Sequence, residues 1–306
     1  MAFDPEVTDY WWPVDYYFGG DHAVSHLLYF RFWNHFFADR GWIAEDKREP
    51  VKKLVYNGYI NGPDGHKMSK SRGNVIDPLD VIDSGYGADA LRMYMLFIGP
   101  YDQDAQWNTN GVPGTYRFLQ RVWHLAQDVL AAKSGRRTVD NEKATLLRIR
   151  TQKATRKVTR DLDALRFNTA IAALMELVND LNKMRDDIPF ELAPQAWRTS
   201  LLELFQLLAP FAPHLSEELW HQFGKEETIH LAGWPTWDSD LLRDDVVTIV
   251  VQVNGKLRGE LQLPIGSSQD DVTEAALALD NVQRHIAQHK LKKAVYVADK
   301  LINFVI

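Results

Sequence analysis

The chain has 306 residues, of which 45% are hydrophobic and 25% are charged, with a formal net charge of −6 and no cysteine. This globular composition leaves room for two or three domains, and the lack of cysteine excludes disulfides, thiolate metal sites and cysteine nucleophiles. We find neither a long apolar run nor a basic, apolar leader, so we expect a cytoplasmic protein with no membrane span. The net charge disfavours nucleic-acid binding by the whole surface but permits a local basic stripe.

The first predicted nucleotide-binding element is a strand, a glycine turn and a helix. Val14 to Phe18 predicts a short buried strand that ends at Gly19-Gly20, and a helical pattern runs from His22 to about Ala38. Open α/β sheets bind nucleotides at such turns, because small residues allow close approach and the helix end offers unpaired N–H groups. The inner face of the helix is expected to hold Val24, Leu27, Leu28, Phe32 and Phe36. His26 lies four residues after His22, but the pair lacks a third ligand, so no metal site is predicted.

A polar, glycine-rich segment from Gly62 to Asn74 is predicted to be a loop. A second helix, Val51 to Tyr56, and a short extended piece, Tyr59 to Asn61, are expected before it. The ammonium groups, hydroxyls and backbone N–H groups of the loop make a good receptor for phosphate oxygens. Its candidate phosphate-binding side chains are those of Lys67, Ser69, Lys70 and Ser71. The alternative is a solvated turn, which is the usual role of a basic loop.

The order Lys67-Met68-Ser69-Lys70-Ser71 resembles the second signature of class I aminoacyl-tRNA synthetases. Gly73 to Pro78 and Gly87 to Arg92, where Asp89 is expected to cap a helix, resemble the valyl, isoleucyl and leucyl enzymes. Gly19 to Ala23 resembles their adenosine-holding Gly-Gly-x-Glu-His-Ala-like segment, but it is one residue shorter and has Asp for Glu. The resemblance implies catalytic roles for Lys70 and Lys67. It also implies ATP binding by Gly19, Gly20, Asp21, His22, Lys67, Ser69, Lys70 and Ser71.

From Thr115 onward, long amphipathic patterns predict a helical bundle. The helix from about Asn141 to Leu165 has one basic side, formed by Arg150, Lys153, Lys157 and Arg160. Such a stripe suits the phosphates of a nucleic-acid backbone, and a solvated helix face is the alternative. Further helices are expected at about Arg166–Met184, Gln195–Leu208 and Ser216–Gln222. The sequences of Leu165 to Glu176 and of Ala212 to Trp220 resemble the anticodon-binding bundle of leucyl-tRNA synthetases.

After Trp234 the pattern changes to strands, and Asn254-Gly255 is a strong hairpin signal. Ser268 opens a predicted helix, and two further strands complete a small α+β module. Val251 to Gly259 resembles the C-terminal module of bacterial-type leucyl enzymes, which touches the outer corner of the tRNA. That resemblance assigns Lys256 and Arg258 to tRNA contact.

The predicted fold is multidomain and mainly α with α/β. Residues 1–110 are expected to form the C-terminal half of a Rossmann-type catalytic domain, including the signature loop. An anticodon-binding α-helical bundle is expected over residues 111–240. A C-terminal α+β domain that contacts tRNA is expected over residues 245–306.

The resemblance implies a leucine–tRNA ligase, which uses ATP with Mg²⁺ to form leucyl-adenylate and then charges tRNA(Leu). The expected partners are ATP, leucine and tRNA(Leu), without a membrane and without a protein-bound metal. The family's first signature, His-x-Gly-His, is absent from the sequence. We therefore expect a missing N-terminal half, in cis or in trans, and no activity from this chain alone. The alternatives are a subunit of a split enzyme, a tRNA-binding module with no catalytic duty, and a different aliphatic specificity.

Overall fold

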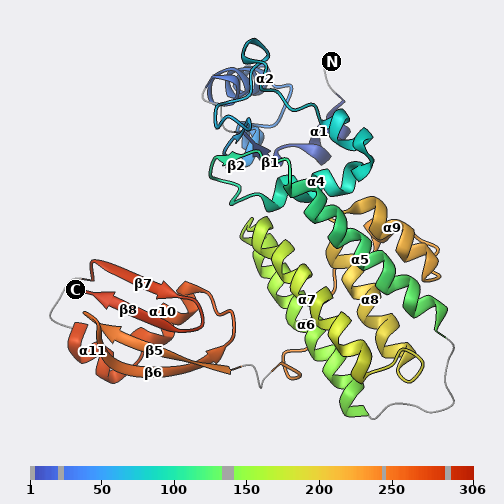
Figure 1. Cartoon of the computed structure of the whole chain (residues 1–306). Helices are drawn as coiled ribbons and strands as arrows, with labels where there is room; N and C mark the ends of the chain where they lie inside the picture. Colours follow the sequence, from blue (N-terminus) through green and yellow to red (C-terminus); the bar gives the residue numbers. More distant parts are fainter. Residues whose placement is uncertain (1–3, 20–23, 133–140, 243–245, 287–290) are drawn as a thin grey trace.

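The computed structural model describes residues 4–19, 24–132, 141–242, 246–286 and 291–306. Figure 1 shows α/β elements at one end of an elongated helical bundle, with the sheet of the C-terminal residues lying beside α6 and α7. The predicted fold class is confirmed, since helices dominate and small sheets lie at both ends of the chain. Within the described residues, each helix is too short or too polar to cross a membrane.

The N-terminal part contains a parallel strand–helix–strand unit. After α1 (Pro5–Trp11), strand β1 (Val14–Phe18) pairs in parallel with β2 (Val51–Val55). The predicted strand at Val14–Phe18 is therefore confirmed, but its predicted burial is wrong, since Tyr16 and Phe18 are about half exposed. The predicted helix at Val51–Tyr56 is also wrong. A segment this short gains little as an isolated helix, while a parallel neighbour supplies partners for its backbone groups. The connection between the strands includes a π-helical turn, Ser25–Phe30, followed by α2 (Arg31–Asp39).

The predicted inner face of this connecting helix is also wrong. The five apolar residues expected inside are 39% to 61% exposed: Val24, Leu27, Leu28, Phe32 and Phe36. The buried side chains are instead His26, Asn34 and Ala38. Two features explain the difference. The π-turn shifts the register of the faces, and the described residues place no element over the apolar side.

Short strands frame the signature loop. Strand β3 (Ile60–Asn61) pairs in parallel with β4 (Ala105–Gln106), and the loop starts at the carboxyl end of β3. The chain then returns through α3 (Pro78–Val81), a π-helical turn at Ile82–Tyr86, and α4 (Gly87–Phe97). The loop is thus held between a strand and the helices that lead into the bundle.

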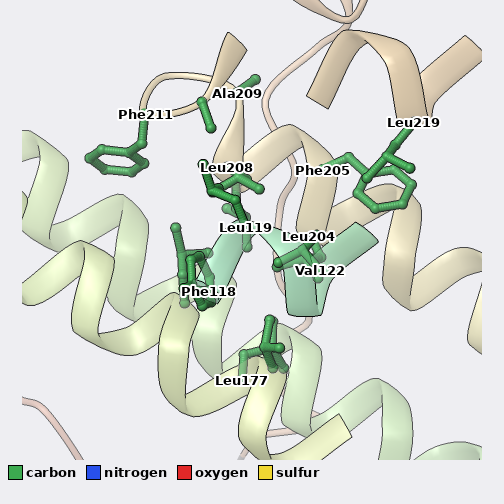
Figure 2. Packing of buried hydrophobic residues seen from close by; sticks show 14 of the residues in the cluster. Phe118, Leu119, Val122, Leu177, Leu204, Phe205, Leu208, Ala209, Phe211 and Leu219 are labelled. Carbon is green, nitrogen blue, oxygen red and sulfur yellow. The ribbon is translucent and has the colours of Figure 1, made fainter. Parts of the chain in front are cut away.

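The bundle has one continuous apolar core, part of which is shown in Figure 2. Its helices are α5 (Gly111–Ala131), α6 (Asn141–Asp163), α7 (Phe167–Asp187), α8 (Pro194–Leu208) and α9 (Pro213–Gln222). Helix α4 joins the same core through Ala90, Met93 and Tyr94, which are almost fully buried. The segment that follows the signature loop is therefore packed as part of the bundle.

Asp89 links α4 to α9. Its carboxylate accepts hydrogen bonds from His214 Nδ1 and from the backbone N–H of Leu215, both at 2.8 Å. Asp89 therefore satisfies a donor in the first turn of α9, and it is not the N-cap of its own helix, whose N-cap is Tyr86. The predicted start of α9 at Ser216 is also wrong. The helix begins at Pro213, because proline is well suited to the first helical position.

Asp89→Ala is expected to lower the free energy of unfolding by about 2 kcal/mol, because a buried acceptor for two donors is lost. Urea unfolding followed by circular dichroism measures the change. Asp83→Ala removes an exposed carboxylate of the same region and serves as the matched control. Equal unfolding midpoints for the two variants would contradict the bridging role of Asp89.

The C-terminal domain has a separate core and a four-stranded sheet in the order β6-β5-β8-β7. Its elements are β5 (Val246–Val253), β6 (Lys256–Pro264), α10 (Gln269–Leu277), α11 (Asp280–Ile286), β7 (Lys293–Val297) and β8 (Leu301–Val305). The predicted hairpin turn is confirmed, with positive φ at both Asn254 and Gly255. The helix opened by Ser268 is also confirmed, and Asp271 completes its capping box.

Candidate functional site

The first half of the signature loop folds back on itself and is bonded to β4. The N–H of Gly62 donates to the carbonyl of His66 at 2.8 Å, and Gln106 Nε2 on β4 donates to the carbonyl of Pro63 at 2.5 Å. A Cβ on Gly62 would lie 2.8 Å from Asp64 Oδ1 and 3.0 Å from the carbonyl oxygen of Asn74, so a larger residue here would displace the Asp64 carboxylate. These contacts tie the first half of the loop to the β3–β4 pair.

A side-chain clamp connects the two halves of the loop. Asn74 Nδ2 donates to both carboxylate oxygens of Asp64, at 3.0 and 3.1 Å, and Asn74 Oδ1 accepts from the N–H of Ser69 at 2.8 Å. The Asn74 amide and the N–H of His66 hold the pKa of the Asp64 carboxyl below its usual value. The carboxylate is therefore ionised at neutral pH, and the clamp is intact there.

The lysines of the loop face solvent while its methionine faces the core. Met68 packs against the bundle cluster, and Lys67 and Lys70 are exposed. The Lys67 ammonium lies 4.1 Å from the centroid of the Tyr59 ring, within cation–π range. The partly buried Met68 and the two exposed lysines thus lie on different sides of the loop.

Ser69 and Ser71 lie on one side of a short helical turn. Their hydroxyl oxygens are 2.7 Å apart, and residues Lys70–Arg72 form a single 3₁₀ turn that ends at Gly73, whose φ is +66°. The side chains of Ser69, Lys70 and Ser71 therefore come from three consecutive positions of one ordered turn. Hydroxyl donors beside ammonium groups can bind phosphate oxygens, and the ammonium groups can stabilise negative charge that develops on them.

Of the predicted adenosine-contacting residues, Gly19 is described, whereas Gly20, Asp21 and His22 lie outside the described residues. The N–H of Gly19 donates to the carbonyl of Val55 at 3.1 Å, which extends the β1–β2 pairing. Phe18, just before it, and Tyr59, beneath Lys67, line the same apolar cavity of about 370 Å³. The carboxyl end of β1 is therefore close to the strand that leads into the signature loop.

The four predicted RNA-binding residues of α6 lie together. Arg150, Lys153, Lys157 and Arg160 all line one cavity beside α7 and the C-terminal domain. Part of this charge already has partners. Arg150 lies 3.8 Å from Asp180, Lys157 pairs with Asp161, and Arg160 Nη1 donates to the carbonyl of Gly266 at 3.0 Å.

The other two predicted RNA-binding residues are far from this stripe. Lys256 and Arg258 lie at the start of β6, and the end of this strand, Pro264, is roughly 26 Å from Lys256 at the usual rise per residue. Lys256 is exposed, whereas Arg258 is half-buried. The two groups could therefore contact only separate parts of a bound RNA.

Sequence patterns did not single out Tyr59, Asp64, Asn74 or Arg156 as site residues. The first three hold the loop, and Arg156 Nη2 donates to the carbonyl of Ile265 at 3.2 Å. One possible signal was the position of Asn74, which follows the signature closely and comes directly after Gly73. The clamp itself forms only when the loop folds back so that Asn74 meets Asp64. Among the described residues, no group of histidine and carboxylate side chains could hold a metal ion.

Asn74→Ala is expected to free the N–H of Ser69, so its amide hydrogen should exchange with solvent about tenfold faster, the factor that about 1.4 kcal/mol of lost protection gives. Hydrogen exchange measured by mass spectrometry on peptides of the loop detects this change. Asn57→Ala, which replaces an asparagine outside the loop, is the control. Unchanged exchange in the Asn74 variant would show that the clamp does not order the loop.

Two family descriptions match this chain. Residues 23–108 match "tRNA synthetases class I (I, L, M and V)", and residues 145–274 match "Anticodon-binding domain of tRNA ligase". The signature loop falls in the first match, and the basic stripe of α6 falls in the second. The fold and site therefore define a segment of a class I tRNA synthetase joined to an anticodon-binding domain.

Curated relatives share this combination along nearly the whole chain. A leucine–tRNA ligase of Chlorobaculum tepidum is 44% identical over 304 residues, which cover 99% of this chain and 36% of the relative. A leucine–tRNA ligase of Rubrobacter xylanophilus is 43% identical over 307 residues, with the same two coverages. The chain is similar to the C-terminal part of these leucine–tRNA ligases and spans about a third of their length.

Solved structures agree with this assignment. The LeuRS in the LeuRS–tRNA–LeuAMS ternary complex of Agrobacterium radiobacter K84 superposes with a TM-score of 0.71 at 34% identity, covering 99% of this chain and 38% of that one. Methionyl-tRNA synthetase of Mycobacterium tuberculosis superposes with a TM-score of 0.55 at 19% identity, covering 70% of this chain and 45% of that one. The second likeness concerns the fold alone.

Proposed function

We propose that this chain supplies the phosphate-binding loop and the tRNA-binding surfaces of a leucine–tRNA ligase. The reaction is ATP-dependent activation of leucine to leucyl-adenylate, followed by transfer of leucine to tRNA(Leu). The observation that carries the proposal is the loop geometry, in which Lys67 and Lys70 are exposed while the partly buried Met68 packs against the core of the bundle.

The loop acts through electrostatics in this proposal. When the leucine carboxylate attacks the α-phosphate of ATP, negative charge develops on the departing pyrophosphate. Ammonium groups held in place meet that charge more strongly in the transition state than in the ground state, which raises the rate. Lys70 and Lys67 take this role, and the hydroxyls of Ser69 and Ser71 bind phosphate oxygens. Mg²⁺ accompanies ATP as part of the substrate.

The remaining roles are divided along the chain. Residues 1–110 serve as the C-terminal half of the catalytic domain, and Gly19, Gly20, Asp21 and His22 contact the adenosine. Residues 111–240 bind the anticodon end of the tRNA, with Arg150, Lys153, Lys157 and Arg160 on phosphates. Residues 245–306 contact the tRNA through Lys256 and Arg258.

The catalytic domain needs further protein for activity in this proposal. The chain spans about 36% of the relatives' length. Its α2 also exposes large apolar side chains, and a surface of this kind commonly marks a protein interface. The segment that carries the family's His-x-Gly-His signature, supplied in cis or in trans, would cover this face and complete the ATP site.

The test is leucine-dependent exchange of pyrophosphate into ATP. The chain is assayed alone and after co-expression with the N-terminal part of the Chlorobaculum tepidum relative, which is 44% identical in the shared region. Exchange is expected only in the complemented sample. Exchange by the purified chain alone would contradict the need for a complement, and no exchange from a well-formed complex would contradict the catalytic role.

A second candidate function is tRNA binding without catalysis, which the basic stripe on α6 favours. In that case the complemented complex would bind tRNA(Leu) but would lack leucine-dependent exchange. The ordered signature loop counts against this alternative, because tRNA binding by the bundle does not require it.

A further inference from the structure

The corner between α6 and α7 packs against the α/β end of the chain. Phe167, the first residue of α7, is half-buried there and meets the ring of Tyr101 edge-to-face, with the ring centroids 6.2 Å apart. Figure 1 shows this corner at the end of the bundle that lies next to the α/β elements. Both rings line the apolar cavity of about 370 Å³ to which Phe18 and Tyr59 also belong. An aromatic side chain of the bundle therefore forms part of the wall beside the segment that leads into the signature loop.

The backbone of this corner is fixed on the bundle side. Leu165 has a φ of +56°, which is uncommon for a residue with a large side chain and persists only where its surroundings hold it. The N–H of Leu165 donates to the carbonyl of Leu162 at 2.9 Å, and the N–H of Arg166 donates to the carbonyl of Asp161 at 2.7 Å. These bonds close the turn, so α7 begins at Phe167 in a defined position relative to α6.

Tyr101 is joined to the segment before the loop by close backbone contacts. Its carbonyl accepts from the N–H of Gly58 at 2.8 Å. The next residue, Tyr59, donates its N–H to Asp104 Oδ1 at 2.8 Å. A Cβ on Gly58 would lie 2.2 Å from the carbonyl carbon and oxygen of Gln103, so the two backbones touch here. A shift of the segment that carries Tyr101 would therefore shift Tyr59 as well.

The ring of Tyr59 makes the contact with the signature loop. The Lys67 ammonium lies over this ring, 4.1 Å from its centroid. The negative face of an aromatic ring attracts a cation, so the ring favours one position of an otherwise mobile side chain. Lys67 is exposed, and the ring is its support on the protein side.

We propose that Phe167 is a positioning residue for the Lys67 ammonium. It acts through the Tyr101 ring and through the backbone contacts that tie Tyr101 to Tyr59. The inference rests on the proposed function in taking Lys67 as a group that meets phosphate. It goes further by giving the first turn of α7 a part in the geometry of the signature loop, in addition to the RNA binding proposed for the bundle.

Labelling with an amine-reactive reagent reports the position of Lys67 without any ligase reaction. The purified full chain is acetylated briefly with N-hydroxysuccinimidyl acetate, and modification of Lys67 relative to Lys70 is measured by mass spectrometry. Phe167→Ala is expected to raise this ratio about threefold, because a ring face stabilises the protonated amine, which does not react. Phe167→Tyr keeps a ring and should give the wild-type ratio. Met175→Ala, which removes another partly buried apolar side chain of α7 outside the cavity, is the matched control.

A double-mutant cycle tests the route from Phe167 to Lys67. Tyr59→Leu alone is expected to raise the labelling ratio by a similar factor, and adding Phe167→Ala to it should change nothing further. Circular dichroism checks that each variant is folded, and Phe167→Leu, which has no ring but keeps apolar volume, replaces Phe167→Ala if the latter does not fold. Equal ratios in the wild type and the Phe167 variant would overturn the inference, and so would independent effects of the two substitutions.

Pyrophosphate exchange by the complemented chain separates this inference from the proposed function. Phe167→Ala is expected to lower kcat about threefold with an unchanged KM for leucine, since Lys67 is proposed to meet charge on the departing pyrophosphate. A changed labelling ratio with an unchanged kcat would overturn the link to the reaction. If the ratio depends on Phe167 while even the wild-type complex lacks exchange, the proposed function fails and the positioning of Lys67 stands. If the wild-type complex is active and the ratio is indifferent to Phe167, the inference fails and the proposed function stands.

Discussion

Lys70→Ala is expected to slow leucine-dependent pyrophosphate exchange by the complemented chain about a hundredfold, or about 3 kcal/mol in activation free energy. The exposed ammonium of Lys70 sits on an ordered turn, and its proposed partner is charge that grows only as pyrophosphate leaves. The loss should therefore appear in kcat more than in the KM for ATP.

The control for this experiment lies in the same turn. Arg72 is exposed and belongs to the Lys70–Arg72 turn, so Arg72→Ala tests whether any cation there would serve. The pyrophosphate exchange rate of the Arg72→Ala complex is expected to stay close to that of the wild-type complex. A Lys70→Ala complex with full activity would reject the role given to the loop, and equal losses in both variants would reject the specific role of Lys70.

Phe205→Ala is expected to lower the free energy of unfolding of the bundle by about 4 kcal/mol, within the range for emptying a buried aromatic site. Phe205 is fully buried and packs edge-to-face on Phe223, with ring centroids 5.1 Å apart. Figure 2 shows it among apolar side chains from neighbouring helices. A loss of this size is a large fraction of the stability of a typical domain, which is about 5–15 kcal/mol.

Urea unfolding monitored by tryptophan fluorescence measures this loss, because Trp197 and Trp220 lie in the same core. Phe32→Ala is the matched control, since Phe32 is 61% exposed on α2. Its effect is expected to stay within about 0.5 kcal/mol, as for most surface substitutions. A Phe205 variant as stable as the Phe32 variant would mean that the core closes over the missing ring.

Local patterns in the sequence predicted the elements whose partners are near in the chain. The strand Val14–Phe18, the hairpin turn at Asn254 and the helix opened by Ser268 all agree with the structure. The turn and the capping box are fixed by contacts within a few residues, whereas the strand was recognised by its β-forming residue types although its partner β2 lies more than thirty residues later. The class of fold followed from these elements and from the long amphipathic helices of the bundle.

The wrong predictions concern elements whose structure depends on contacts with residues that are distant in the sequence. A short apolar segment at Val51 fits a helix or a strand equally well until its parallel neighbour β1 is known. The helical spacing of apolar residues predicts that the exposed side of α2 faces the core. This spacing carries no information on whether another element covers that side. Asp89 resembles the cap of its own helix, yet its carboxylate binds a helix more than a hundred residues later.

The charged residues of the candidate site could be predicted from the sequence, but the contacts that position them could not. Lys67, Lys70 and the basic stripe of α6 follow from residue type and order. The Asp64–Asn74 clamp and the contact between Lys67 and Tyr59 require the folded loop. The hydrogen bonds from Arg156 and Arg160 to the C-terminal domain could not be predicted from the sequence, because their acceptors are backbone carbonyls.

The core that α4 shares with the bundle also fixes the distance between two parts of the chain. Helix α6 has 23 residues and is therefore about 35 Å long, and α4 is packed directly on the same core. The separation between the signature loop and the far end of the bundle is thus set by helix length. Shortening α6 and α7 by one turn each would bring the far end of the bundle about 5 Å closer to the loop, and under the proposed function it would move the tRNA contacts of that end by the same distance.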